Sequence, residues 1–308
     1  MEKDQRLLRH LVAENCAPLL QCYNSGMIFN NKTVIITGGS KGVGAATARM
    51  FADAGANLML VARNKKNLDL IAEELRDKTR VEVFAMDVAD ADACIDVFKK
   101  AMFEFGRVDI LVNNAGCHER GPVQKVDAVD LGKMIDVNLK APIILSRIAI
   151  PYLQDAGGGA IINVGSLAGR APLPGYAAYG ASKAGLRSFT YALGAELADS
   201  GIKLAVIAPG PIDTGFIMAD IDATSNLTFS QPISTAEEVA QVVLDLCGNK
   251  VTEQSMPRVS GWLTMGSYLF PRLRTVLQPM LERKGAKVKA KLKLQRKRKR
   301  LESDSPEH

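Results

Sequence analysis

From residue 33 onward, short apolar runs alternate with longer amphipathic segments. The short runs are rich in Val, Ile, Leu and Ala, a composition typical of parallel strands buried on both faces. The longer segments have the periodicity of helices that cross over a sheet. The alternation predicts an α/β fold with one doubly wound parallel sheet. Its strands are expected at Thr33–Thr37, Leu58–Val61, Val81–Ala85, Val108–Val112, Ala160–Val164 and Lys203–Ile207.

Residues 32–266 are therefore expected to form a single domain around this sheet. They are preceded by an N-terminal extension, residues 1–31, whose apolar stripe predicts a short helix. Residues 267–285 are amphipathic, although Pro279 argues against one unbroken helix. Residues 286–308 form a basic tail, which we expect to be disordered because like charges repel one another.

The composition permits a large folded core. The chain has 308 residues, of which 47% are hydrophobic. Its apolar runs are shorter than the ~18 to 20 residues of a membrane span, and its first residues lack the basic-then-apolar order of a secretory signal. We therefore expect a cytoplasmic protein. Five scattered cysteines without a Cys-x-x-Cys pair, and three dispersed histidines, predict neither a disulfide framework nor a metal site.

The net charge of +6 comes from the C-terminal segment. Residues 283–300 contain eleven Lys or Arg and no Asp or Glu, so the remainder of the chain has a net charge of −5. Three interpretations of this basic run stay open: a solvated tail, a contact with an anionic membrane surface, or a nucleic-acid contact or nuclear-import signal.

Tyr179 and Lys183 stand four residues apart. On a helix this spacing places both side chains on one face. An ammonium held near a phenol favours the phenolate and lowers a pKa that starts near ~10, which makes the tyrosine a usable proton donor and acceptor. The same spacing also occurs on solvated helices, so the pair alone does not establish catalysis.

A glycine-rich turn follows the first predicted strand directly. The segment Thr37–Gly44 has glycines at positions 38, 39, 42 and 44, and a helical run, Ala45–Ala54, comes next. Glycines in such a turn let the backbone approach a pyrophosphate, and the helix N-terminus offers unpaired N–H groups to its charge. Between a strand and a helix, the turn predicts a dinucleotide site, although glycines also serve tight turns.

Further motifs follow in a fixed order. Asn113-Asn114-Ala115-Gly116 comes after the fourth strand, Ser166 precedes Tyr179 by thirteen residues, and Pro209-Gly210 comes after the sixth strand. Together with the glycine turn, these motifs resemble the short-chain dehydrogenase/reductase family over residues 32–214. The resemblance implies a Rossmann fold and an enzyme that interconverts carbonyls and alcohols with a nicotinamide cofactor.

The resemblance also implies roles for four residues. Tyr179 would protonate the carbonyl oxygen as hydride arrives, and Lys183 would lower the pKa of Tyr179 and hold the nicotinamide ribose. Ser166 would hydrogen-bond the substrate oxygen and share its developing charge. Asn138 matches the asparagine that holds a water molecule linking the lysine to solvent.

The choice of cofactor depends on charge near the second strand. An unphosphorylated ribose is usually met by a carboxylate there, whereas a 2′-phosphate needs a cation. The strand ends in Arg63 without an acid, and Lys41 precedes Gly42, so we expect NADP(H). Asp87 would lie near the adenine, or instead cap the next helix. The implied cofactor-binding residues are Gly38, Ser40, Lys41, Gly42, Val43, Gly44, Arg63, Asp87, Val88, Asn114, Ala115, Gly116, Tyr179, Lys183, Pro209, Gly210, Ile212 and Thr214.

The substrate is expected to be hydrophobic. Residues 215–232 have the mixed composition of a lid with apolar side chains, and Cys117 and His118 would line the same mouth. We expect Tyr176 to be a wall residue and His118 to be a surface histidine, with a second acid as the alternative. The predicted function is NADPH-dependent reduction of an oxoacyl, sphingoid or steroid-like ketone in lipid metabolism by a homodimer or homo-oligomer. The alternative is an NADPH-binding regulatory protein, or an RNA-associated or peripheral membrane protein, with little catalysis.

Overall fold

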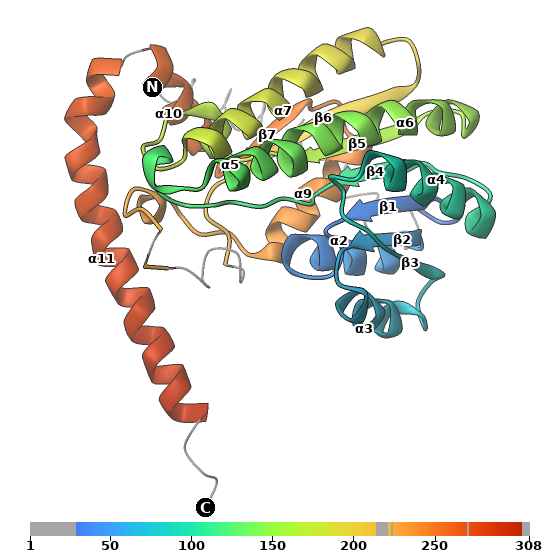
Figure 1. Cartoon of the computed structure of the whole chain (residues 1–308), viewed down its shortest axis with the longest axis horizontal. Helices are drawn as coiled ribbons and strands as arrows, with labels where there is room; N and C mark the ends of the chain where they lie inside the picture. Colours follow the sequence, from blue (N-terminus) through green and yellow to red (C-terminus); the bar gives the residue numbers. More distant parts are fainter. Residues whose placement is uncertain (1–28, 214–220, 223, 270, 304–308) are drawn as a thin grey trace, which may run out of the picture.

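The computed structural model describes residues 29–213, 221–222, 224–269 and 271–303 (Figure 1). The expected N-terminal helix and Thr214 lie outside the described residues. Seven parallel strands form one sheet in the order β3-β2-β1-β4-β5-β6-β7. The strands are β1 Thr33–Thr37, β2 Asn57–Ala62, β3 Val81–Ala85, β4 Ile110–Asn113, β5 Gly159–Val164, β6 Ile202–Pro209 and β7 Glu253–Met256. The predicted α/β doubly wound sheet is confirmed.

Helices cover both faces of the sheet (Figure 1). Alternate residues of β1 point to opposite faces, so Val34 and Ile36 pack with α2, α3 and α9, whereas Ile35 packs with α4, α6 and α7. The helices are α2 Gly42–Asp53, α3 Lys65–Leu75, α4 Ala91–Phe105, α5 Ala128–Ile135, α6 Ala141–Asp155, α7 Ala177–Glu196, α9 Ala236–Gly248, α10 Arg258–Leu269 and α11 Pro271–Ser303. The shorter helical turns are η1 Val123–Lys125, η2 Asp136–Lys140, η3 Leu167–Arg170 and η4 Thr228–Ser230.

Strand order reverses between β1 and β4, which pair with each other. The strands β2 and β3 lie on the far side of β1, and β5, β6 and β7 lie on the far side of β4. In open α/β sheets, ligands bind in the crevice outside the carboxyl ends of the strands at such a point. The glycine turn after β1 and the segment after β4 both open into this crevice. The topology therefore places the two sequence motifs at one site.

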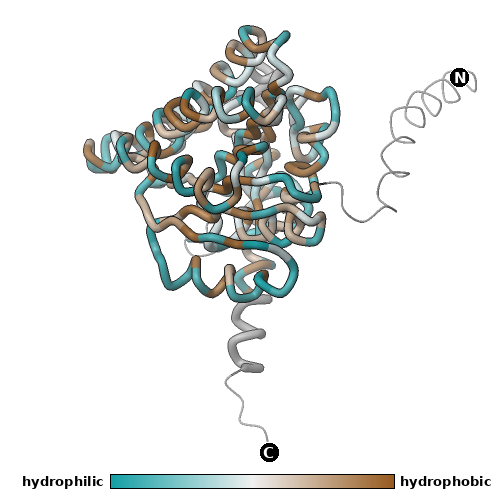
Figure 2. Tube along the Cα trace, turned by 90° about the vertical axis from the view of Figure 1, so that its right-hand side faces the viewer, coloured by the Kyte–Doolittle hydropathy of each residue, from teal (hydrophilic) through white to brown (hydrophobic). Residues whose placement is uncertain are grey.

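Two elements differ from the sequence-based predictions. The strand β7 was not predicted, because its residues Glu253–Met256 lack an apolar run. The helix α11 continues through Pro279 to Ser303, where we expected a broken helix and a disordered tail. Its Lys, Ala, Leu, Gln and Arg residues are good helix formers, and one of its faces packs on the body. Figure 1 shows that its C-terminal part extends beyond the body, and Figure 2 shows the body turned by 90°.

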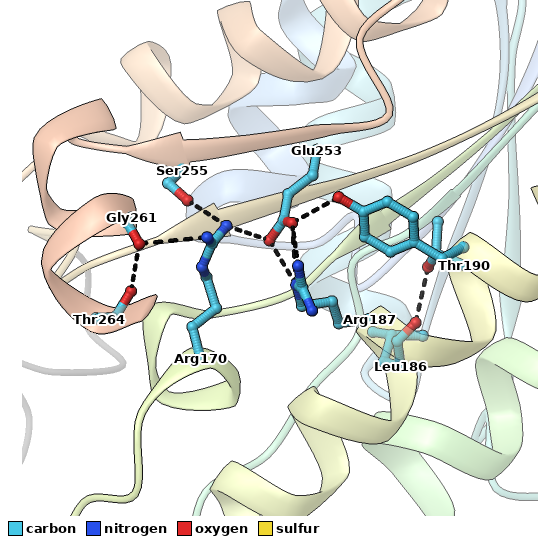
Figure 3. Close-up of polar contacts among 9 residues, drawn as sticks. Arg170, Leu186, Arg187, Thr190, Glu253, Ser255, Gly261 and Thr264 are labelled. Carbon is cyan, nitrogen blue, oxygen red and sulfur yellow. Dashed lines mark hydrogen bonds and ion pairs between the residues drawn. The ribbon is translucent and has the colours of Figure 1, made fainter. Parts of the chain in front are cut away.

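A buried carboxylate explains how the polar strand β7 is held (Figure 3). Glu253, whose side chain is 6% exposed, accepts hydrogen bonds from Arg170 of η3 at 2.5 Å and from Arg187 of α7 at 2.9 Å. Tyr191 of α7 donates to the same carboxylate at 2.8 Å. Arg170 also donates to Ser255 of β7. The network fastens α7 and η3 to the last strand of the sheet.

The substitution Glu253→Gln is expected to lower the free energy of unfolding at pH 7 by about 3 kcal/mol, because it leaves two largely buried arginines without their anion. Burial acts to raise the pKa of Glu253, but the hydrogen bonds from Arg187 and Tyr191 and the charges of Arg170 and Arg187 together hold this pKa below its ordinary value. The stabilisation is therefore present above the unfolded-state pKa and is lost as the pH falls through the folded-state pKa.

Urea denaturation of the wild type and the variant at neutral and acidic pH measures this difference. Glu196→Gln, at an exposed position near the end of α7, is the matched control and should change the stability by no more than about 0.5 kcal/mol. Equal stability of Glu253→Gln and the control would show that the network does not hold β7.

Candidate active site

The predicted pair Tyr179 and Lys183 lies on α7, beside the carboxyl end of β5. Lys183 is only 5% exposed, and its Nζ donates a hydrogen bond to the carbonyl oxygen of Val164, the last residue of β5, at 2.8 Å. The same Nζ lies 6.0 Å from the centroid of the Tyr179 ring. The helical spacing of four therefore places both side chains in one buried region, as predicted.

Ser166 stands at the start of η3, where its Oγ accepts a hydrogen bond from the backbone N–H of Ala168 at 3.1 Å. Its hydroxyl also hydrogen-bonds Tyr179 and acts to lower the pKa of that phenol. The turn η3 packs closely on α7, since a Cβ on Gly169 would lie 2.6 Å from the carbonyl carbon of Lys183. Three of the four predicted catalytic residues thus share one site.

Burial sets the protonation states of this site. Desolvation raises the pKa of Tyr179 to about 12, against the opposing hydrogen bond from Ser166. Desolvation also lowers the pKa of Lys183 to about 8. We expected Lys183 to lower the pKa of Tyr179, but the net pKa of this phenol is raised, because its removal from water is the largest effect on it. The phenol is protonated at neutral pH.

Asn138 connects the segment after β4 to α7. It lies in the π-helical turn η2, where its side chain is fully buried. Its Oδ1 accepts from the N–H of Cys117 and its Nδ2 donates to the carbonyl of Cys117, each at 2.9 Å. Nδ2 also lies 3.2 Å from Oγ of Ser182, which in turn donates to the carbonyl of Tyr179 at 2.7 Å. Asn138 thus fixes the segment after β4, at Cys117, relative to Tyr179.

An aromatic stack covers Tyr179. The imidazole of His118 lies parallel to the Tyr179 ring, with centroids 4.1 Å apart, and 4.7 Å from the Tyr176 ring. Burial lowers the pKa of His118 to about 4, so this residue is neutral at pH 7. We expected a surface histidine, and the structure instead places it against the tyrosine. The Tyr176 hydroxyl hydrogen-bonds Thr228 of η4 at 2.7 Å, so Tyr176 is a wall residue, as expected.

Sequence reasoning missed His118 as a stacking partner and Thr228 as a wall residue. The only sequence signal for His118 is its place two residues after the Asn-Asn-Ala-Gly turn. Thr228 gave no signal, since it comes from a segment without a pattern. Arg120, also missed, acts electrostatically to lower the pKa values of Tyr179 and His118.

The glycine turn forms a cradle whose walls leave no room for side chains. A Cβ on Gly44 would overlap the carbonyl oxygen of Gly38, which has a φ of +66°. Asn114 Nδ2 donates to the carbonyl of Thr37 at 2.8 Å, and the Thr37 Oγ1 accepts from the N–H groups of Asn114 and Ala115 at 3.0 Å. The turn after β1 and the turn after β4 are thereby joined. No side chain caps the N-terminus of α2 at Lys41, and the N–H groups of such a helix N-terminus fit a pyrophosphate.

The cations expected to select the cofactor lie near the ends of β1 and β2. Arg63 has a side chain that is 78% exposed, and its Nη1 is 3.9 Å from Oδ2 of Asp87. Lys41 is exposed at the N-terminus of α2. Asp87 does not cap α4, because Asp90 accepts from the first N–H groups of that helix. Asp87 Oδ1 instead accepts from the N–H of Ala89.

The other predicted cofactor residues that the structure describes also follow strand ends. Gly210 donates its N–H to the carbonyl of Met256 at 2.8 Å, and Ile212 pairs with Ser234 in an isolated parallel bridge. Ser40, Gly42 and Val43 come after β1, Val88 after β3, Ala115 and Gly116 after β4, and Pro209 at the end of β6.

The substitution Lys183→Met is expected to stabilise the protein at pH 7 by about 2 kcal/mol. A lysine with a folded-state pKa of about 8 and a reference pKa near ~10.5 destabilises the folded state by about 3 kcal/mol below pH 8, and loss of the bond to Val164 offsets about 1 kcal/mol. Between these two pKa values the unfolded chain binds more protons, so wild-type stability rises with pH. The gain should therefore fall to about zero near pH 10.

Thermal denaturation of the cofactor-free protein at both pH values checks this expectation. Lys140→Met replaces an exposed lysine and should show no such dependence on pH. A gain that is the same at pH 7 and pH 10 would mean that the buried charge is not its cause.

The parallel, doubly wound sheet with a glycine cradle at the reversal of strand order defines a dinucleotide-binding α/β protein. The family model described as short chain dehydrogenase matches residues 32–224. The chain therefore belongs to the short-chain dehydrogenase/reductase family of oxidoreductases, whose members use NAD(P)H. The cradle of Gly38 and Gly44 fits this cofactor. None of the described helices is long and apolar enough to cross a membrane.

Relatives within this family have several names. The chain is 40% identical over 216 residues to sulfoacetaldehyde reductase 2 of Chromohalobacter salexigens, covering 68% of this chain and 86% of the relative. It is 33% identical over 230 residues to a 3-oxoacyl-(acyl-carrier-protein) reductase of Thermotoga maritima, covering 73% and 93%. It is 33% identical over 245 residues to dehydrogenase/reductase SDR family member 7B of Rattus norvegicus, covering 75% of each.

Proposed function

We propose that the protein reduces a hydrophobic ketone, such as an oxoacyl, sphingoid or steroid-like compound, to an alcohol with NADPH. The observation that carries the proposal is the pair of hydroxyls of the half-buried residues Tyr179 and Ser166, which lies in one region with the buried Lys183 amine. NADPH, when bound, supplies a hydride to the carbonyl carbon. Tyr179 gives its phenolic proton to the carbonyl oxygen, which completes the alcohol.

The protonation states of the resting site suit reduction. Tyr179, with a pKa of about 12, holds the proton that it must donate. Ser166 donates a hydrogen bond to the substrate oxygen and shares the charge that develops there. Lys183, with a pKa of about 8, is mostly protonated at pH 7, and its positive charge stabilises the phenolate that remains after proton transfer. It would also hold the nicotinamide ribose.

Asn138 and His118 support this set from two sides. Asn138 holds Cys117, in the segment after β4, in place against α7. We propose that it also positions a water molecule between Lys183 and solvent. The neutral ring of His118 covers one face of Tyr179 and excludes water there. A drier site strengthens each electrostatic interaction that acts on the reacting oxygen.

The wall beside Tyr179 supports a hydrophobic substrate. Tyr176 lines a cavity of about 40 Å³. Its other lining residues are Leu173, Pro174, Ser225, Leu227, Thr228, Gln278 and Glu282. Leu173, Pro174, Tyr176 and Leu227 offer apolar carbon to a substrate, and Ser225, Thr228, Gln278 and Glu282 make the rest of the lining polar. Among the relatives, the name 3-oxoacyl reductase agrees better with such a wall than the name sulfoacetaldehyde reductase.

The substitution Tyr179→Phe is expected to reduce kcat by at least about 10³-fold, because it removes the proton donor. NADPH affinity should stay within a few fold of the wild type, since the ring and its packing remain. The assay follows NADPH absorbance with ketones of increasing size. Tyr176→Phe is the matched control, which loses the bond to Thr228 and should raise KM while keeping kcat. Full activity of Tyr179→Phe would exclude the mechanism, and failure of the wild type to reduce any ketone would favour a binding protein.

We propose NADPH as the cofactor because Arg63 and Lys41 are exposed beside the cradle and no acid ends β2. Arg63→Ala is expected to lower kcat/KM for NADPH roughly tenfold, because the variant loses one hydrogen bond to a charged phosphate. The value for NADH should change by less than about twofold. Arg76→Ala, which removes an exposed arginine at the end of α3, is the control. An equal effect of Arg63→Ala on both cofactors would contradict the assignment.

Exposed apolar side chains support a homodimer or larger homo-oligomer. Phe103 of α4, Val129 of α5 and Ile143 of α6 have large exposed fractions. Exposed apolar side chains on surface helices can be covered by a second copy of the chain.

A further inference from the structure

The helix α11 has two chemically different faces. Its inner face packs on the segment that precedes and includes η4, where Val288 and Leu292 contact Ile221 and Phe229. A Cβ on Gly285 would overlap the carbonyl oxygen of Asn226, so this helix approaches the body closely.

Two lysines of the inner face are used by the body itself. Lys289 Nζ donates to the carbonyls of Asp222 and Thr224 at 2.9 and 2.8 Å, and Lys293 forms an ion pair with the side chain of Asp222. These cations are therefore not available to an external partner. The position of α11 is fixed by specific contacts along three turns.

The outer face combines cations with exposed apolar side chains. At about 100° per residue, positions 280, 283, 284, 287, 291 and 294 fall within one arc of about 100°, opposite the residues that contact the body. Met280 and Leu294, at the two ends of this row, are 59% and 58% exposed. Arg283, Lys284, Lys287 and Lys291 lie between them and are exposed. Among the described residues, none of these four cations pairs with an acidic side chain.

We propose that this outer face of α11 docks on an anionic phospholipid surface. The row from Met280 to Leu294 is about 21 Å long at 1.5 Å per residue, and it carries four positive charges and no negative charge. The sequence continues with five further cations, Arg296–Arg300, on the same helix. Helices that lie on membranes present lysines to anionic headgroups and insert apolar side chains between them.

The apolar ends of the row favour a membrane over a nucleic acid. A nucleic-acid surface is bound through cations, hydrogen-bonding groups and stacked aromatic rings, and it has no place for exposed Met and Leu side chains along the phosphate backbone. A layer of anionic headgroups can pair with the four cations of the outer face and also admit the Met280 and Leu294 side chains. The docking face is separate from the active site, so the proposal does not rest on the proposed reaction.

Co-sedimentation of the full chain with phosphatidylcholine vesicles, with and without phosphatidylserine, tests the proposal. Binding is expected only with phosphatidylserine and should weaken with salt. The triple variant K284Q/K287Q/K291Q should lower partitioning roughly 100-fold, since each cation contributes about fivefold. The control triple K78Q/K99Q/K140Q removes the same charge from exposed sites on the body and should bind within about threefold of the wild type.

A second variant separates the membrane from other anions. M280Q/L294Q keeps every charge and should lower vesicle partitioning roughly tenfold. Absence of wild-type binding to phosphatidylserine vesicles would overturn the proposal, as would equal binding by the two lysine triples. Unchanged vesicle binding by M280Q/L294Q, together with equally tight binding to single-stranded RNA, would show a general polyanion contact instead. Unchanged thermal denaturation of each variant confirms that the fold is intact.

Discussion

The burial of Lys183 is the constraint on which the site depends. A buried ammonium destabilises the folded state unless polar groups meet it, and here the carbonyl at the end of β5 accepts its hydrogen bond. That bond requires α7 to lie close against η3, which Gly169 permits because it has no side chain. Ser166 and Tyr179 are brought together by the same approach. The buried charge of Lys183 therefore lowers the stability of the fold, and contacts elsewhere in the structure must compensate for this loss.

The compensation comes from both sides of α7. On one side, the chain of hydrogen bonds from Cys117 through Asn138 and Ser182 ends at the Tyr179 carbonyl. On the other side, Glu253 binds Arg187 and Tyr191 of the same helix. These contacts hold α7 between the segment after β4 and the strand β7. A well-fixed helix keeps Tyr179 and Lys183 near one another, which the proposed proton transfer requires.

The C-terminal helix extends this arrangement to the wall of the site. Its inner face holds the segment that includes Thr228, whose hydroxyl contacts Tyr176, and Tyr176 in turn lies near the ring of His118. A continuous series of contacts thus leads from α11 to the residues that cover Tyr179. If the outer face of α11 meets a lipid surface, the wall of the active site lies next to the phase in which a hydrophobic ketone would be dissolved.

Local patterns in the sequence predict the first six of the seven strands, the helix that carries Tyr179 and Lys183, and the glycine cradle. Each of these is a local pattern, because alternation of apolar runs reports burial and a spacing of four reports one helical face. The tertiary structure was needed to see that polar Glu253 belongs to a strand, that His118 stacks on Tyr179, and that α11 remains helical to Ser303. Burial in the folded chain also raises the pKa of Tyr179, where the sequence predicted that it falls. All of these depend on partners distant in sequence or on removal from water, which no local pattern encodes.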